Sequence, residues 1–374
     1  MDKKYLIKNY YINKKVIRLF FIIFTLFFVL DITACHKKTI TIYEGPSTDL
    51  GEQYVKEGRY HDALNYYETK LEQIIKNSGE YSQNAAVFYD HIGEVYIYLG
   101  NRDEALNFLD KAIQINTKYK DELELAVNYN QIGKIYINIG GDAKEGLSYL
   151  DKAEAIYRKK SLEKSLAMAS VLSNKGRLYN KVGQYEKALE YYKSALNIDQ
   201  TNGQDKAKLY IVIGQLYVNM KEFKKAEEQY YNAENIILEE NNEYLMGKLS
   251  QEEGLLYDEQ GEYEKAISQY EKAINIFESD RQYDLDLALV YNNMGYAYIM
   301  RNELEKALEK FTTACQIIEN VSPCTKQVEE DRRDYKHNLR QCYQGLTGDT
   351  SEENFEKWYQ DKMSEKLKGV DNSQ

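Results

Sequence analysis

Proline, histidine and tryptophan are scarce in this chain of 374 residues, which contains two, four and one of them respectively. The prolines are Pro46 and Pro323, so the long segment between them has none. A proline inside a helix removes a backbone hydrogen bond and clashes with the preceding turn. The absence of proline therefore favours an uninterrupted helical body between these two positions.

The chain also lacks the groupings of side chains that enzymes and metal sites require. Its histidines are scattered, with no metal-ligand spacing; they are His36, His61, His91 and His337. There is no phosphate-binding glycine loop, no G-x-G-x-x-G and no H-E-x-x-H sequence. We therefore predict a protein that is not an enzyme, with no catalytic residue, no metal and no cofactor. The alternative, an enzyme or a sugar-binding protein, is supported by no cluster of residues.

Acidic side chains outnumber basic ones over most of the chain. The formal net charge is −11, and residues 1–34 carry six basic and two acidic side chains, a net of +4. The remainder therefore carries −15 (−11 − 4). An acidic body repels the phosphates that supply most of the affinity for nucleic acids. We expect no nucleic-acid partner.

A pattern that recurs seven times fills the segment between the prolines. Each unit has a reference Gly, then Tyr at +3, Gly at +7, Ala at +12, Leu or an aromatic residue at +16 and Ala at +19. The reference glycines are Gly51, Gly93, Gly133, Gly176, Gly214, Gly254 and Gly295. Their mean spacing is (295 − 51)/6, or about 41 residues. The unit at Gly133 slips by one residue, Lys221 and Asn302 replace the +7 glycine in two others, and Lys70 replaces the +19 alanine in the first.

Each small residue has a physical role in a pair of antiparallel helices. The reference Gly and the two alanines permit close approach of the two helices. The large residues at +3 and +16 fill the space beside them, and the +7 Gly ends the first helix. Over residues 46–320 the pattern resembles the tetratricopeptide repeat family. The common repeat of that family has about 34 residues, so the long-repeat kinesin light chain and Rap types are more similar. The resemblance implies an all-α, right-handed superhelical solenoid of about seven helix-turn-helix repeats, with C-terminal capping helices.

The N-terminus has the features of a bacterial lipoprotein signal peptide. A basic stretch precedes a run of twelve residues at 19–30, apolar except for Thr25, which is short for a transmembrane helix. Ile32-Thr33-Ala34-Cys35 then resembles a lipobox. The resemblance implies cleavage after residues 1–34, lipidation (palmitate) of Cys35, and a tether at 35–45. We expect an extracytoplasmic protein, anchored in the cell membrane or outer membrane; the alternative is an uncleaved signal anchor.

The residues after the repeats predict two further helices. Residues 321–346 form a capping helix, and residues 347–374 form an amphipathic helix and tail that begins with Thr350 and Glu353 in capping-box spacing. An apolar face carries Phe355 and Trp358. This second helix either folds back over the end of the solenoid or docks a partner.

Three cysteines, Cys315, Cys324 and Cys342, follow Cys35. A Cys315–Cys324 disulfide is feasible in an oxidising compartment, and buried free thiols are the alternative.

The family resemblance also implies where a ligand binds. In such arrays the first helix of each unit lines a concave groove, with positions −3, −2, +1 and +5 from the reference Gly directed inward. The predicted groove residues are Asn130, Gln131, Lys134, Asn138, Asn174, Arg177, Lys181, Gln215, Asn219, Asn292, Asn293 and Tyr296. In long-repeat relatives, asparagine at −2 bonds the backbone of an extended peptide. The cluster of Lys134, Arg177 and Lys181 in an acidic protein suggests an acidic peptide segment; the alternative is solvated helix faces.

Together these features predict a protein- or peptide-binding scaffold or assembly factor at the bacterial cell envelope. The alternative is a peptide-sensing receptor or regulatory protein that responds through a change in its superhelix.

Overall fold

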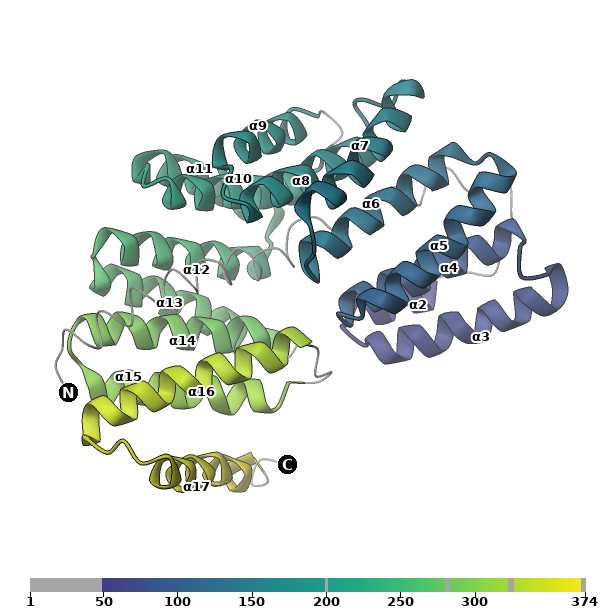
Figure 1. Cartoon of the computed structure of the whole chain (residues 1–374). Coiled ribbons are helices and arrows are strands. Elements are labelled where there is room, and N and C mark those ends of the chain that lie inside the picture. The colour runs from purple at the N-terminus through teal and green to yellow at the C-terminus, as the bar shows by residue number, and fades with distance from the viewer. Residues whose placement is uncertain (1–48, 199–200, 280–282, 322–325, 371–374) are drawn as a thin grey trace. The chain divides into compact units, whose positions relative to one another are not determined.

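The computed structural model describes residues 49–198, 201–279, 283–321 and 326–370. These residues form sixteen α-helices and no strand (Figure 1). The helices are α2 (Asp49–Lys56), α3 (Tyr60–Ser78), α4 (Gln83–Tyr98), α5 (Arg102–Tyr119), α6 (Glu122–Asn138), α7 (Ala143–Lys159), α8 (Leu166–Lys181), α9 (Tyr185–Leu196), α10 (Gly203–Asn219), α11 (Phe223–Glu240), α12 (Glu243–Gln260), α13 (Tyr263–Phe277), α14 (Asp284–Met300), α15 (Leu304–Glu319), α16 (Lys326–Thr347) and α17 (Glu352–Val370).

Helices α2 to α15 form the seven predicted pairs. Within pairs, α4 packs on α5, α6 on α7, α8 on α9, α12 on α13 and α14 on α15. Second helices pack in turn on the first helix of the next pair, as α5 does on α6 and α13 does on α14. The predicted all-α repeat solenoid is confirmed.

The reference glycines lie where the two helices of a pair approach most closely. A Cβ added at Gly93 would lie 2.8 Å from Leu109, and one at Gly295 would lie 2.7 Å from Phe311. Both Leu109 and Phe311, at the +16 position, are fully buried. The predicted pairing of a small residue with a large one is therefore confirmed.

The residue at +7 adopts a left-handed backbone whether or not it is glycine. The φ angles are +71° at Gly100 and +80° at Gly261, and they are +61° at Lys221 and +66° at Asn302. The turn between the two helices thus imposes this conformation, which costs a residue with a Cβ more than it costs glycine.

Side-chain caps begin several of the helices. The side chains of Ser82, Asn101, Asp121 and Ser165 each accept a hydrogen bond from the backbone N–H three residues later. Such a cap satisfies one of the backbone donors that have no partner within the helix.

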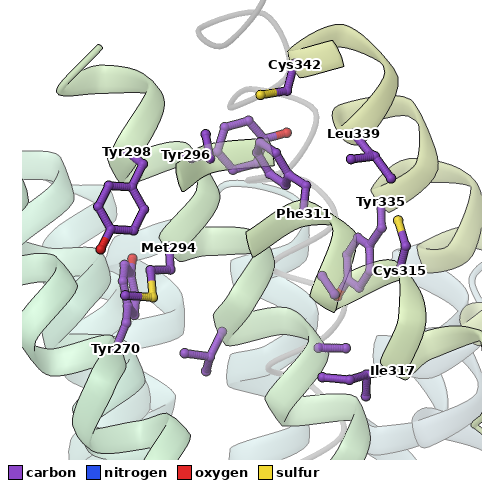
Figure 2. Packing of buried hydrophobic residues seen from close by; sticks show 14 of the residues in the cluster. Tyr270, Met294, Tyr296, Tyr298, Phe311, Cys315, Ile317, Tyr335, Leu339 and Cys342 are labelled. Atoms are coloured by element: carbon purple, nitrogen blue, oxygen red, sulfur yellow. The ribbon is translucent and has the colours of Figure 1, made fainter. Parts of the chain in front are cut away.

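The described residues divide into two compact units between Leu216 and Tyr217, within α10. We call them the N-terminal unit and the C-terminal unit. In the C-terminal unit, residues of α13 to α17 share one hydrophobic core. Figure 2 shows Phe311 beside Tyr296, and these rings lie 5.2 Å apart, edge to face. Leu339 of α16 also lies in this core.

The last two helices cover the end of the C-terminal unit. Phe355 and Tyr359 of α17 are buried, and the ring of Trp358 lies 5.0 Å from that of Tyr343 on α16. The interpretation in which α17 folds back is the one the structure shows. The predicted capping box is wrong: Ser351 caps α17, since its Oγ accepts from the N–H of Asn354 at 3.3 Å.

Cys315 and Cys342 are buried free thiols. Burial raises the pKa of Cys342 to about 12, and it raises the pKa of Cys315 further. Both thiols are therefore held protonated. Cys324, the predicted disulfide partner of Cys315, lies outside the described residues.

Residues 1–48, including Cys35 and the expected signal peptide, also lie outside the described part of the chain. Among the helices that the structure describes, none combines the length and the apolar composition needed to cross a bilayer.

Candidate functional site

The first helices of neighbouring repeats contact one another, as α4 does with α6 and α6 does with α8. We call the surface formed by their −3, −2, +1 and +5 positions the inner face. In the N-terminal unit its centre is a pair of amides from adjacent repeats. The Nδ2 of Asn174 donates to the Oδ1 of Asn130 at 2.9 Å. Asn130 in turn donates to the Oγ of Ser170 at 3.2 Å.

Arg177 extends this network along α8. Its guanidinium donates to the Oδ1 of Asn174 at 3.3 Å and to the Oδ1 of Asn138 at 3.0 Å. Both of these contacts are with neutral amide oxygens, which position the guanidinium. Asn174 and Arg177 are 3% and 4% exposed, so they are not independently solvated side chains on a helix surface.

Lys181 lies one turn beyond Arg177. Its Nζ donates to the backbone carbonyl oxygens of Tyr136 and Ile137, at 3.2 and 2.8 Å, near the end of α6. Burial lowers the pKa of Lys181, and the positive charge of Arg177 lowers it further. Two cations are thus held close together at the cost of mutual repulsion.

The third predicted cation, Lys134, is differently placed. Its Nζ lies 3.1 Å from the Oε1 of Glu94 on α4. Burial acts to raise the pKa of Glu94, but Lys134 and a hydrogen bond from Gln131 outweigh burial and hold that pKa below its ordinary value. The Lys134 charge is therefore neutralised locally, and the positive charge of the inner face resides in Arg177 and Lys181.

Two buried acceptors complete the inner face of the N-terminal unit. The Oε1 of Gln131 and the Oγ of Ser173 have no hydrogen-bond partner among the described residues. A buried polar atom without a partner costs roughly 1–3 kcal/mol, and a donor supplied by a ligand would remove this cost.

The remaining predicted residues lie on α10 and α14. Gln215 and Asn219 are half-buried on α10, on either side of the boundary between the units. On α14, the Oδ1 of Asn292 accepts from Asn338 of α16 at 3.0 Å. Asn293 is 4% exposed, and its Nδ2 has no partner among the described residues. Tyr296 lies in the core, which explains why burial raises its pKa.

Sequence reasoning missed three contributors. Ser170 lies at −6, one turn before the positions that were considered, and its contact with Asn130 depends on how two repeats stack. Glu94 occupies +1, but only its distance from Lys134 gives it a role. Asn338 belongs to α16, outside the repeat pattern, so no spacing from a reference glycine marks it.

The described residues contain no group of three or more His, Cys, Asp or Glu side chains placed to hold a metal ion. The inner face instead offers amides, hydroxyls and two cations. Its chemistry is that of hydrogen bonding and charge recognition.

Comparison with known families identifies the repeats. Models described as tetratricopeptide repeat match residues 40–118, 123–201, 207–237 and 250–320. The chain belongs to the tetratricopeptide repeat family. The resemblance inferred from the glycine spacing is thereby confirmed.

Curated relatives include human Tetratricopeptide repeat protein 29, which is 27% identical over 148 residues, 40% of this chain and 30% of the relative. Protein KINESIN LIGHT CHAIN-RELATED 2 of Arabidopsis thaliana is 21% identical over 226 residues, 58% of this chain and 34% of the relative. The chain thus spans about a third of the length of these relatives.

Solved structures of similar fold include a Rap protein complexed with competence and sporulation factor. Its TM-score is 0.58 at 20% identity, over 75% of this chain and 74% of that one. Aspartyl phosphate phosphatase F from Bacillus subtilis has a TM-score of 0.58 at 18% identity, over 74% and 70%. At these identities the likeness concerns the fold.

Proposed function

We propose that this chain is a protein- or peptide-binding scaffold or assembly factor, tethered at the bacterial cell envelope, and that the inner face of its N-terminal unit binds an acidic peptide segment. The support for this proposal is chemical. Arg177 and Lys181 provide adjacent positive charge, and Gln131 and Ser173 provide buried acceptors. A carboxylate side chain can meet the cations while backbone N–H groups of an extended peptide meet the acceptors.

The observation that carries the proposal is the placement of Arg177. Amide oxygens from two repeats, those of Asn138 and Asn174, hold its guanidinium in position. Because its planar fork is held before a ligand arrives, a carboxylate binds it with little loss of side-chain entropy.

The test uses the full chain and a short, capped, fluorescent peptide of alternating Glu and Thr. We expect Arg177→Gln/Lys181→Gln to weaken binding at least tenfold and to reduce its dependence on salt concentration. The control, Lys187→Gln/Lys193→Gln, removes the same charge from the exposed surface of α9 and should leave binding unchanged.

Equal helical content and equal urea midpoints must first show that both variants are folded. If the double variant is unfolded, Lys181→Gln alone serves the same purpose, since Lys181 contacts only backbone carbonyls in the described contacts. Equal weakening in the control variant would refute an inner-face site.

Envelope tethering forms a separate part of the proposal. It rests on the apolar run and on the lipobox-like residues 32–35. Replacing Cys35 by Ala should abolish cleavage of the signal peptide and weaken the association of the protein with the membrane. If Cys35→Ala leaves an unprocessed chain as firmly bound as the wild type, the N-terminus is a signal anchor and the lipidation proposal is wrong.

A peptide-sensing receptor is the second candidate. It is favoured by the likeness in fold to a Rap protein complexed with competence and sporulation factor. A receptor of this kind should change its superhelix on binding, so the radius of gyration from solution scattering should fall when peptide is added. A scaffold should bind with no such change.

A further inference from the structure

We propose that the inner face of the C-terminal unit is a second peptide subsite, with a charge preference opposite to that of the first, which binds the main-chain carbonyls of a segment carrying Lys or Arg. This inference rests on the proposed peptide-binding function. It is argued from Gln251, Asn293, Glu252 and Glu259, four residues at inner-face positions of α12 and α14.

Repeat equivalence locates the subsite. Asn130 and Asn174 occupy −3 in one repeat and −2 in the next, and they hydrogen-bond across the repeat boundary. Gln251 and Asn293 occupy the same two positions around Gly254 and Gly295. The helices that carry them, α12 and α14, are in contact. Gln251 and Asn293 are therefore the counterpart of the bonded amide pair in the N-terminal unit.

In the C-terminal unit the nitrogens of these two amides have no partner among the described residues. These atoms are Gln251 Nε2 and Asn293 Nδ2, and the two residues are 0% and 4% exposed. The Oε1 of Gln251 accepts from Lys248 at 3.3 Å. Because an ammonium group has no acceptor, this contact fixes which end of the Gln251 amide is the open donor.

A ligand that presents oxygen atoms would satisfy these two buried donors. The charge of the surroundings decides which kind. Inner-face positions of the last two repeats contain Glu252 and Glu259 and no basic residue. The nearby Lys248 is already paired with Asp286 at 2.8 Å. A carboxylate ligand would be repelled here, whereas a neutral peptide carbonyl next to a cationic side chain would be attracted.

Within the N-terminal unit, helices α6 and α8 have the opposite composition, although α4 carries Asp90 and Glu94 at inner positions. The inner face on α6 and α8 carries Lys134, Arg177 and Lys181 and no acidic residue at the same positions. Each subsite should therefore bind a separate short peptide and discriminate against the other.

The test measures binding of two capped fluorescent peptides to the full chain in mild detergent. One alternates Lys with Thr and the other alternates Glu with Thr. We expect Asn293→Leu and Glu252→Gln each to weaken binding of the Lys–Thr peptide about five- to tenfold. Neither should change binding of the Glu–Thr peptide, which reports on Arg177 and Lys181.

A stability measurement separates a binding role from a structural one. Asn293→Leu removes a buried amide whose Nδ2 has no partner among the described residues, so the urea midpoint should stay the same or rise. Asn128→Leu is the matched control, because Asn128 is 0% exposed and both ends of its amide are hydrogen-bonded. Its Oδ1 accepts a hydrogen bond from Asn116 at 2.9 Å, and its Nδ2 donates one to Asp90 at 2.6 Å. That variant should unfold at clearly lower urea.

Three results would overturn the inference: no binding of the Lys–Thr peptide, equal binding by wild type and both variants, or an Asn293→Leu midpoint that falls as far as that of Asn128→Leu. If the wild type binds the Lys–Thr peptide but not the Glu–Thr peptide, the proposed function of the N-terminal unit is contradicted instead. The two failures are therefore distinguishable.

Discussion

The left-handed residue at +7 allows a prediction in which only backbone conformation changes. Lys221 has φ of +61°, and its side chain is exposed. In this conformation a residue with a Cβ is less stable than glycine by roughly 1–2 kcal/mol. Glycine loses more backbone entropy on folding, which returns roughly 0.5–1 kcal/mol. Lys221→Gly should therefore stabilise the protein by about 0.5–1 kcal/mol.

The matched control reverses the change at an equivalent position in the same unit. Gly261 has φ of +80°, and a Cβ there would meet only the hydroxyl of Tyr263, at an ordinary contact distance of 3.9 Å. Gly261→Ala should thus destabilise by about 0.5–1 kcal/mol, the same difference taken in reverse. Asn302→Gly should stabilise less than Lys221→Gly, because asparagine tolerates positive φ better than lysine does.

The assay is urea unfolding followed by far-UV circular dichroism. The stability of a solenoid is close to a sum over repeats and their interfaces, so each variant should shift the transition of the unit that carries it. Opposite shifts for Lys221→Gly and Gly261→Ala are expected. If both variants shift the midpoint in the same direction, the turn does not impose the left-handed conformation and the reasoning is wrong.

Three further predictions concern the C-terminal unit. Lys248→Met leaves the buried carboxylate of Asp286 without its cation and should lower stability by about 3–5 kcal/mol in the same assay. Burial and a neighbouring carboxylate raise the pKa of Glu253 to about 7, so stability should fall as pH rises from 5 to 7, and Glu253→Gln should flatten that slope. Phe355→Ala, at a fully buried position, should lower the free energy of unfolding by about 3–5 kcal/mol, mainly because α17 loses its packing. Fluorescence of Trp358, the only tryptophan, should then shift to the red.

The helical pairs were predictable because each depends on residues close together in the sequence. A reference glycine and its +16 partner, such as Gly176 and Tyr192, lie in the two helices of one repeat, and their sizes are complementary. The positions where glycine is replaced were equally informative, since Lys221 and Asn302 keep the left-handed backbone. Local packing and turn geometry thus follow from the spacing.

Contacts between repeats were harder to predict from the sequence. The spacing placed Asn130 and Asn174 at inner positions, but their mutual hydrogen bond depends on the offset between α6 and α8. The bonds from Lys181 to backbone carbonyls leave no sequence signal, because every residue has a carbonyl. The cap of α17 was missed by one residue, because the spacing of Thr350 and Glu353 matches a capping box although Ser351 is the better N-cap residue by type.

The two amide pairs differ in what stands one helical turn away. At −6 in the repeat of Gln251 is Lys248, whose ammonium donates to the Gln251 oxygen. The same position in the repeat of Asn130 is Val127, which has no polar side-chain atom to compete for the Asn130 amide. The Asn130 oxygen accepts from Asn174, whereas the Gln251 oxygen accepts from Lys248 and the Asn293 Nδ2 has no partner among the described residues. An amide oxygen can accept two hydrogen bonds, so Lys248 competes with Asn293 for the Gln251 oxygen without excluding it.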